Sequence, residues 1–408
     1  PRADTHGAPA QTILELVMTA TADEVQTSPL DAARALAPMI RAAADQTERE
    51  RRLPQEVVEA LRGAGLFHLT VPQELNGLQA DPLLLAQVVE EVAAADGSAG
   101  WCVMIASQNA VLSGFADRGA ATTMLASGGI LAGTARPIGR AVPKDGGCVV
   151  SGRWPFASGS SHADWFVAEC LRYEGDGNSD EPLRDETGNA VSFMAFLPRE
   201  QVTVHDTWHT TGLRGTASND FSVDGVFVPE PFLLRMFPQP WHPWPFYRTL
   251  ALMFNTHGAH ALGLGRAAVE AAIAAAQVKT GWGTTRPLAE QGRLQLQLAE
   301  AFVLVESARE HLHGATSRLW EAAQRGDDLG RLNARLRLAT SHAASASWRA
   351  VESLHAALGT TAIFASSPLE RQFRDMRTAA AHVMVGSLTY EAAGRVELGL
   401  PAGMPFFE

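Results

Sequence analysis

The sequence predicts an α+β protein in which a β domain lies between two helical domains. Up to about residue 128, apolar residues recur at three- and four-residue steps, as they do on the buried face of a helix. Short apolar segments between Gly, Asp and Pro turns, which are typical of strands, follow up to about residue 235. Long segments rich in Ala and Leu then restore the helical periodicity, as in an antiparallel four-helix bundle.

These changes of pattern divide the chain into four parts. We expect a flexible N-terminal segment over residues 1–28 and an N-terminal helical domain over 29–128. A central β-barrel or β-sandwich domain is expected over 129–235, and the C-terminal helical bundle over 236–408.

Composition argues against several kinds of partner and compartment. A net charge of −11 over 408 residues disfavours nucleic-acid binding, because phosphates require a concentrated positive face. No signal-peptide pattern opens the chain, and no apolar run approaches the roughly 20 residues of a membrane span. Three cysteines without CxxC spacing suggest reduced thiols in a cytoplasmic protein. We expect no metal site, because carboxylates at ligand spacing are lacking around His257, His260, His311 and His313.

The N-terminal domain contains several helix starts. Asp31 and Asp81 are N-cap residue types, and Pro54 and Pro82 suit a first helical turn. A further helix is expected over about residues 97–115.

In the β domain, strands are expected at 148–156, 165–171, 191–197 and 221–228, with a long hairpin loop over 173–189.

The bundle is entered through an aromatic segment, 241–246. This segment is either a rigid linker or a lid that places Trp241 over a planar substrate. Long helices are then expected over 263–278, 290–325 and 329–357.

Several motifs follow one another in a fixed order, at 133–139 (GTARPIG), 147–159 (GCVVSGRWPFASG), 207–218 (TWHTTGLRGTAS), 226–230 (VFVPE), 367–371 (SPLER) and 374–375 (RD). The series resembles the acyl-CoA dehydrogenase superfamily over nearly the whole chain. It is most similar to the group D two-component flavin-dependent monooxygenases, which include hydroxyphenylacetate-type and hydroxysteroid-type hydroxylases and desulfurisation monooxygenases.

This resemblance implies a bound flavin, FMN or FAD. An isoalloxazine ring needs a flat, partly apolar slot with nearby hydrogen-bond donors. Trp154 and Phe156 could form an aromatic wall and Ser158 could donate, although aromatic residues on a strand are more often part of the core. The residues that we assign to the cofactor are Thr134, Trp154, Phe156, Ala157, Ser158, Arg286 and Arg371.

Two arginines in predicted turns could either bind ligands or be exposed to solvent. The resemblance places Arg286 at the flavin phosphate, which the planar guanidinium group suits. It places the glycine-rich turn of Arg214 at the edge of the active-site cleft.

The end of the chain distinguishes dehydrogenation from oxygenation. In the dehydrogenases of the superfamily, a glutamate base usually follows the Arg-Asp pair by eight residues. Val383 occupies that position here, and the residue before it, His382, lies in an Ala-rich stretch expected to be helical. The monooxygenases carry an active-site histidine there, and an imidazole with a pKa near neutrality could remove a phenol proton or donate to a flavin hydroperoxide. Alternatively, His382 is a core residue and Glu391 is the base.

The chain departs from the hydroxylases of this branch at one position. Asn109 stands where they usually carry a second histidine, and an amide can donate but cannot titrate. This departure leaves N- or S-oxygenation open beside phenol hydroxylation.

The sequence thus favours the oxygenase component of a two-component flavin monooxygenase, since it carries no NAD(P)H fingerprint. A separate flavin reductase would supply reduced FMN or FAD, and O2 would form a C4a-hydroperoxyflavin that oxygenates a small aromatic or heteroaromatic substrate. We expect His382, Ser158 and Asn109 to be catalytic, and we assign the substrate to Asn109, Arg214, Trp241 and His382. An FAD-dependent acyl-CoA dehydrogenase and a non-catalytic flavin scaffold are the alternatives. We also expect a homotetramer.

Overall fold

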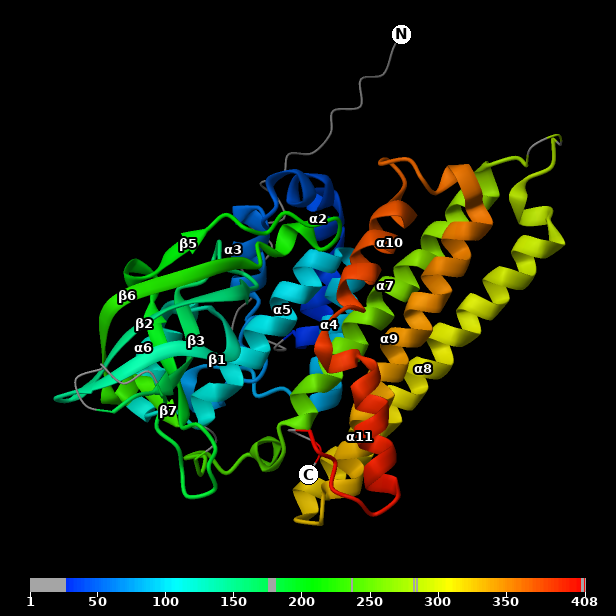
Figure 1. The fold of residues 1–408 in the computed structure, drawn as a ribbon. Helices are drawn as coiled ribbons and strands as arrows, with labels where there is room; N and C mark the ends of the chain where they lie inside the picture. Colours follow the sequence, from blue (N-terminus) through cyan, green and yellow to red (C-terminus); the bar gives the residue numbers. More distant parts are fainter. Residues whose placement is uncertain are drawn as a thin grey trace, which may run out of the picture.

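The structure is a computed structural model that describes residues 27–174, 181–235, 238–281, 283, 285–404 and 407. In these ranges the chain forms a helical N-terminal part, a central sheet and C-terminal helices (Figure 1). This arrangement confirms the predicted α+β class.

The N-terminal part consists of α2 (Pro29–Glu50), α3 (Gln55–Gly63), α4 (Pro82–Ala95), α5 (Gly97–Ala110) and α6 (Arg118–Leu125). Asp81 caps α4 as predicted, accepting hydrogen bonds from two backbone N–H groups. The expected cap at Asp31 is wrong, because the Ser28 hydroxyl caps α2 one turn earlier. Pro54 lies just before α3 rather than in its first turn. The helix expected over 97–115 ends at Ala110 and continues as a 3₁₀ turn, Val111–Gly114.

The β domain is one continuous mixed sheet whose strands share a single core. Its strands are β1 (Leu131–Lys144), β2 (Gly147–Ala157), β3 (Trp165–Arg172), β4 (Ser192–Pro198), β5 (Thr203–His205), β6 (Asn219–Pro229) and β7 (Leu233–Arg235), in the spatial order β5-β6-β2-β1-β3-β4-β7. Only the β1–β3 pairing is parallel among these strands. Part of the loop expected at 173–189 lies outside the described residues.

The C-terminal part contains α7 (Ala251–Val278), α8 (Gly292–Arg325), α9 (Gly330–Leu358), α10 (Pro368–Ala379) and α11 (Ser387–Glu397). Among the described residues, α7 alone is long and apolar enough to cross a membrane by length and composition. However, 56% of its most apolar window is buried inside the protein, as in a core helix.

His382 is not in a helix, contrary to expectation. α10 ends at Ala379, and His382 has an extended backbone (φ −70°, ψ 136°) at the start of a short 3₁₀ turn, Val383–Val385. The extended backbone lets the imidazole accept a hydrogen bond from the turn that follows, as an N-cap residue does.

α5 connects the parts of the fold, since it lies between the sheet and α7 (Figure 1). Its residues are small near the N-terminus, and this allows close packing on both sides. A Cβ at Gly97 or Gly100 would clash with Leu264 or Ala93. Side chains on α5 can therefore meet groups from the sheet, from α7 and from the segment after α10.

Candidate active site

Trp101, on α5, is the centre of a cluster that joins three parts of the fold. Its indole N–H donates to the Ser158 hydroxyl at 3.0 Å. The edges of three imidazoles surround it, with centroid distances of 5.6 Å to His257, 5.1 Å to His260 and 5.5 Å to His382. Trp101 thus brings together two residues predicted from separate motifs, Ser158 and His382.

Trp101 and two of its histidine neighbours were not among the predicted site residues. The available signal was a lone large aromatic in a run of small residues, Gly97-Ser-Ala-Gly-Trp101. Sequence spacing does indicate that His257 and His260 share a face of α7. It does not show that this face meets Trp101.

Ser158 is the first member of a buried chain of hydroxyl groups. Its Oγ lies 2.7 Å from Ser218 Oγ, which lies 2.7 Å from Thr216 Oγ1. Thr216 also bonds the carbonyl of Leu213 at 2.9 Å. The Ser158 oxygen accepts a hydrogen bond from the Trp101 N–H, so its own proton must point toward another acceptor. The orientation of this hydroxyl is therefore well defined. Ser158 is 7% exposed, so a ligand that reaches it must lie in the same water-poor environment.

Phe156 and Trp154 do not form a common aromatic wall. Trp154 is fully buried, stacks on Phe221 at 5.1 Å and donates to the carbonyl of Glu169. Its side chain is a core residue of the sheet, which corrects the expectation that it faces a flavin. The Phe156 ring, in contrast, is 55% exposed and meets the edge of Trp208 at 6.3 Å.

The backbone of Phe156 adopts an unfavourable conformation beside Ser158. Its φ is +67°, in the left-handed region that bulky side chains rarely adopt. The β2–β6 register shifts between Trp154 and Ala157, and the irregularity turns the Phe156 ring out of the core. Ala157 is fully buried and holds the end of β2 in place. Such local strain costs about 1–3 kcal/mol and is concentrated at functional sites.

His382 is held as a neutral imidazole. Its Nδ1 accepts from the backbone N–H of Met384 at 3.3 Å, and its ring stacks on His257 at 4.5 Å. Burial and the positive charge of Arg337 lower the pKa of His382 to about 4. The pKa near neutrality that we expected is therefore wrong. With Nδ1 accepting, the proton is on Nε2, so His382 is suited to donate a hydrogen bond rather than to act as a general base.

The neighbouring histidines are also neutral. Burial lowers the pKa of His257 well below its usual value, and His382 and Arg337 add to the effect. Burial lowers the pKa of His260 to about 4, and its Nε2 lies 2.8 Å from the carbonyl of Gly97. Because none of the three imidazoles is charged at neutral pH, the cluster is a largely apolar surface with a few directional donors.

Asn109 and Thr134 lie where α5 meets β1. The amide of Asn109 donates to the carbonyl of Leu131 at 3.4 Å, and its side chain is half-buried. Thr134 is half-buried at the irregularity between Thr134 and Gly139 of β1. Glu391, the alternative base, is exposed on α11, and Val383 is 61% exposed. The acid and the valine thus both lie outside the buried cluster.

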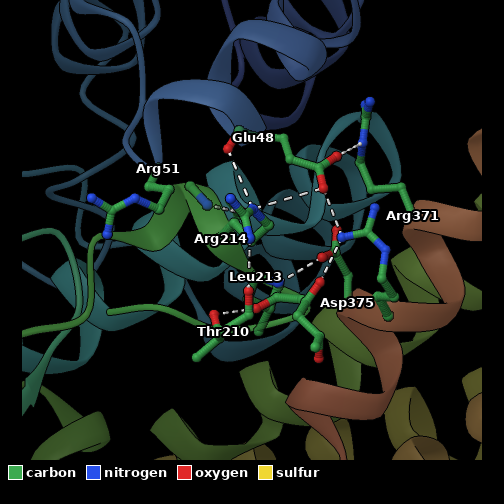
Figure 2. A network of polar contacts seen from close by, with 12 residues as sticks. Glu48, Arg51, Thr210, Leu213, Arg214, Arg371 and Asp375 are labelled. Atoms are coloured by element: carbon green, nitrogen blue, oxygen red, sulfur yellow. Dashed lines mark hydrogen bonds and ion pairs between the residues drawn. The ribbon is translucent and has the colours of Figure 1, made fainter. Parts of the chain in front are cut away.

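Arg371 and Arg214 belong to a network of ion pairs (Figure 2), and Arg371 also lines a cavity beside α2, α7 and α10. Arg371 pairs with Asp45 and, at 2.9 Å, with Glu48 of α2. Arg214 donates to the carbonyl of Thr210 at 3.0 Å and lies 3.9 Å from the Glu48 carboxylate. These contacts do not test the roles expected for Arg371 at the flavin and Arg214 at the substrate, which stay predictions.

The same network reaches Asp375, the acidic member of the Arg-Asp motif. Its carboxylate accepts from the backbone N–H of Leu213 at 2.6 Å, and Arg374 pairs with Glu48 at 2.7 Å (Figure 2). Burial raises the pKa of Asp375 to about 7, and the nearby carboxylate of Asp96 contributes. The motif thus fastens α10 to α2 and to the glycine-rich turn, and this position directs the following segment toward Trp101.

Arg286 and Trp241 lie apart from the cluster around Trp101. Arg286 is exposed in the α7–α8 connection, at the end of the bundle away from the sheet (Figure 1). Trp241 donates to the carbonyl of Ser113 at 2.8 Å and packs under Arg118. Its contacts fit the rigid linker rather than a lid.

The cluster fits a planar aromatic cofactor better than a metal ion. In the described ranges, no group of three His, Cys, Asp or Glu side chains could hold a metal. Trp101 and the neutral imidazoles around it supply an apolar face, and the Ser158 hydroxyl and the Nε2–H of His382 supply hydrogen-bonding groups, as a flavin requires.

Comparison with known proteins agrees with this geometry. The family models of the acyl-CoA dehydrogenase N-terminal and C-terminal domains match residues 23–121 and 255–387. An indole-3-acetate monooxygenase of Pseudomonas putida is 30% identical over 371 residues, which cover 88% of this chain and 90% of that protein. HsaA of Mycobacterium tuberculosis, the oxygenase subunit of a flavin-dependent monooxygenase, is 31% identical over 402 residues (90% and 94%).

The similarity extends to solved structures. XiaF from Streptomyces sp., in complex with FADH2 and glycerol, matches with a TM-score of 0.85 and 25% identity, over 97% of this chain and 100% of that one. The chain therefore belongs to the acyl-CoA dehydrogenase superfamily, in its branch of flavin-dependent monooxygenase oxygenase components.

Proposed function

We propose that this chain is the oxygenase component of a two-component flavin-dependent monooxygenase acting on a small aromatic or heteroaromatic substrate. The observation that carries the proposal is His382, a neutral donor beside Trp101 and Ser158, at a place where a dehydrogenase needs a carboxylate base. Neither Val383 nor the exposed Glu391 can supply that base from inside the cluster.

The residues of the cluster have separate roles in this proposal. Reduced flavin, when bound, supplies the electrons that activate O2. Phe156 would contribute apolar contact to the flavin, and Ser158 would orient it through a hydroxyl fixed by Trp101 and Ser218. The Nε2–H of His382 donates to oxygen at the reacting centre, while the buried imidazole of His257 helps to exclude water.

Reduced FAD or FMN would come from a separate flavin reductase. The chain has no dinucleotide-binding fingerprint, and the similar HsaA is an oxygenase subunit by name. XiaF, bound to FADH2, favours FAD over FMN as the first cofactor to test.

The experiment combines the protein with a flavin reductase, NADH, FAD, ¹⁸O2 and an aromatic substrate such as indole. We expect a product that contains one ¹⁸O atom, and we expect none when the reductase or the flavin is omitted. Tightly bound yellow FAD that is bleached anaerobically by an acyl-CoA would instead identify a dehydrogenase and contradict the proposal.

A further inference from the structure

Arg337, on α9, is a buried cation with most of its hydrogen-bonding capacity unused. It is 0% exposed, and Nη2 donates to the carbonyl of Met384 at 3.2 Å. Nε and Nη1 have no hydrogen-bond partner in the part of the chain that the structure describes. Arg331 and Arg335, on the same helix, both pair with Glu397, whereas Arg337 takes part in none of the ion pairs between described residues.

This arrangement is unfavourable for the protein alone. Burying a guanidinium without an anion costs several kcal/mol. Burial lowers the pKa of Arg337 only to about 10, so the side chain stays charged at neutral pH. An anion that joins the guanidinium would therefore recover much of this cost, through the strong hydrogen bonds of a charged pair.

Arg337 is also fixed in position relative to the active site. The carbonyl of Met384 accepts from Arg337, and the N–H of the same residue donates to Nδ1 of His382. A row of aromatic rings runs in parallel, since the guanidinium lies 4.7 Å from the Phe254 ring and Phe254 stacks on His257 at 6.4 Å. His257 then stacks on His382, so one chain of contacts links the cation to the catalytic histidine.

The surroundings of the guanidinium are aromatic rather than polar. Phe254 lies on one side, and the buried ring of Phe407 lies 5.3 Å away. Such walls suit a planar organic acid better than a hydrated inorganic ion, because they offer flat apolar contact and no further donors.

From these contacts we infer that Arg337 binds the carboxylate of an aromatic acid substrate and so directs the aromatic ring toward His382. This inference rests on the proposed monooxygenase function and adds the substrate class to it. A guanidinium is well suited to this task because its donors match the geometry of a carboxylate.

The test compares an acid with its neutral counterpart, indole-3-acetate with indole, in wild type and in Arg337→Met. We expect the ratio of kcat/KM for the acid to that for indole to fall at least about tenfold, mainly through KM, as for the loss of hydrogen bonds to a charged group. Calorimetric titration without turnover should show the same loss of affinity for indole-3-acetate. Arg337→Lys should keep part of the preference, because it keeps the charge.

Arg335→Met is the matched control, since Arg335 lies two residues away on α9 with its side chain 53% exposed. It should leave the ratio unchanged. An unchanged ratio in a folded Arg337→Met protein would overturn the inference, as would a wild-type protein that binds indole and indole-3-acetate equally. An equal loss for both substrates with a raised KM for FAD would assign Arg337 to the flavin phosphate instead.

The two proposals can fail separately. If wild type oxygenates neither compound, the proposed function loses its support, while the calorimetric comparison still decides whether Arg337 holds a carboxylate. If wild type oxygenates indole but Arg337→Met leaves the ratio of kcat/KM for indole-3-acetate to that for indole unchanged, the proposed function stands and the inference is wrong.

Discussion

Neutral His382 has a consequence for the acid stability of the protein. The unfolded imidazole has a pKa of about 6.5, and burial beside Arg337 lowers the folded pKa to about 4. The unfolded state therefore binds the proton more readily between these values. The stability contributed by a neutral His382 is complete above pH 6.5 and is lost as the pH falls toward 4.

His382→Asn should reduce this loss. We expect the free energy of unfolding of wild type to fall from pH 6.5 to 4 by up to about 3 kcal/mol more than that of the variant. Asp375, whose pKa is raised to about 7, has the opposite effect on stability as the pH falls. Because it is present in both wild type and variant, its contribution cancels in the comparison. Urea unfolding at a series of pH values measures the difference. Parallel pH profiles would show that His382 titrates normally.

Ser158→Ala should lower the stability of the fold and weaken the coupling of NADH consumption to oxygenation of the substrate. The change leaves the Trp101 N–H without its acceptor and Ser218 without a partner, at a cost of about 1–3 kcal/mol. We expect more H2O2 per NADH consumed and less oxygenated product. Ser161→Ala is the control, since this neighbouring hydroxyl is exposed. Unchanged product yield in Ser158→Ala would remove Ser158 from the site.

Residue types were easier to predict than residue environments. Ser158 and His382 could be found from motif spacing, and both contact Trp101. The pKa of His382 could not, because it depends first on burial by segments far apart in the chain and then on Arg337, which lies 45 positions earlier and carries no motif. Trp154 was misassigned because alternation along β2 is broken by the irregularity at Phe156.

At the scale of elements, three separate segments are fastened together by one carboxylate. Glu48, in α2, accepts from Arg371 and Arg374 of α10 and lies near Arg214 of the glycine-rich turn (Figure 2). Although burial opposes ionisation, these arginines hold the pKa of Glu48 below its usual value. The carboxylate therefore stays charged and positions α10 ahead of His382.

Glu48→Gln should weaken the contacts that hold α2, α10 and the glycine-rich turn together. We expect a loss of about 1–3 kcal/mol in the free energy of unfolding, because two partly buried arginines lose a charged partner. A lower kcat should accompany it, since the segment after α10 carries His382. Glu50→Gln, a nearby exposed carboxylate on α2, should stay within about 0.5 kcal/mol of wild type. Equal effects of the two changes would contradict a special role for Glu48.

For the whole molecule, exposed apolar side chains indicate assembly. Leu296, Phe302 and Val303 of α8 are 60%, 55% and 61% exposed, and Ile363 and Phe364 between α9 and α10 are 62% and 63% exposed. Apolar side chains gathered on a long helix favour packing against other subunits. We propose that they contribute to the expected homotetramer.

Phe302→Asp should weaken that assembly without unfolding the chain, because the side chain is exposed within one subunit. Sedimentation velocity should show tetramers for wild type and smaller species for the variant. Gln324→Asp places the same charge at another exposed position of α8 and should leave the assembly intact. A monomeric wild type would contradict the proposal.

The order of helices, strands and helices could be predicted because it follows from local periodicity. The order and pairing of the strands could not, since the parallel β1–β3 pairing joins segments with β2 between them in the chain. Long-range contacts of this kind also decide that α5 lies between the sheet and α7, where Trp101 becomes the meeting point.

The backbone of Phe156 has a consequence for protein engineering. Glycine would adopt a φ of +67° freely, so Phe156→Gly would remove the strain and sacrifice a ring that is already 55% exposed. A selection for heat resistance alone would thus reward the loss of this aromatic face. Thermostable descendants of this protein should be screened for product formation at every round, because the proposed contact of Phe156 with the flavin would be lost with any gain at position 156.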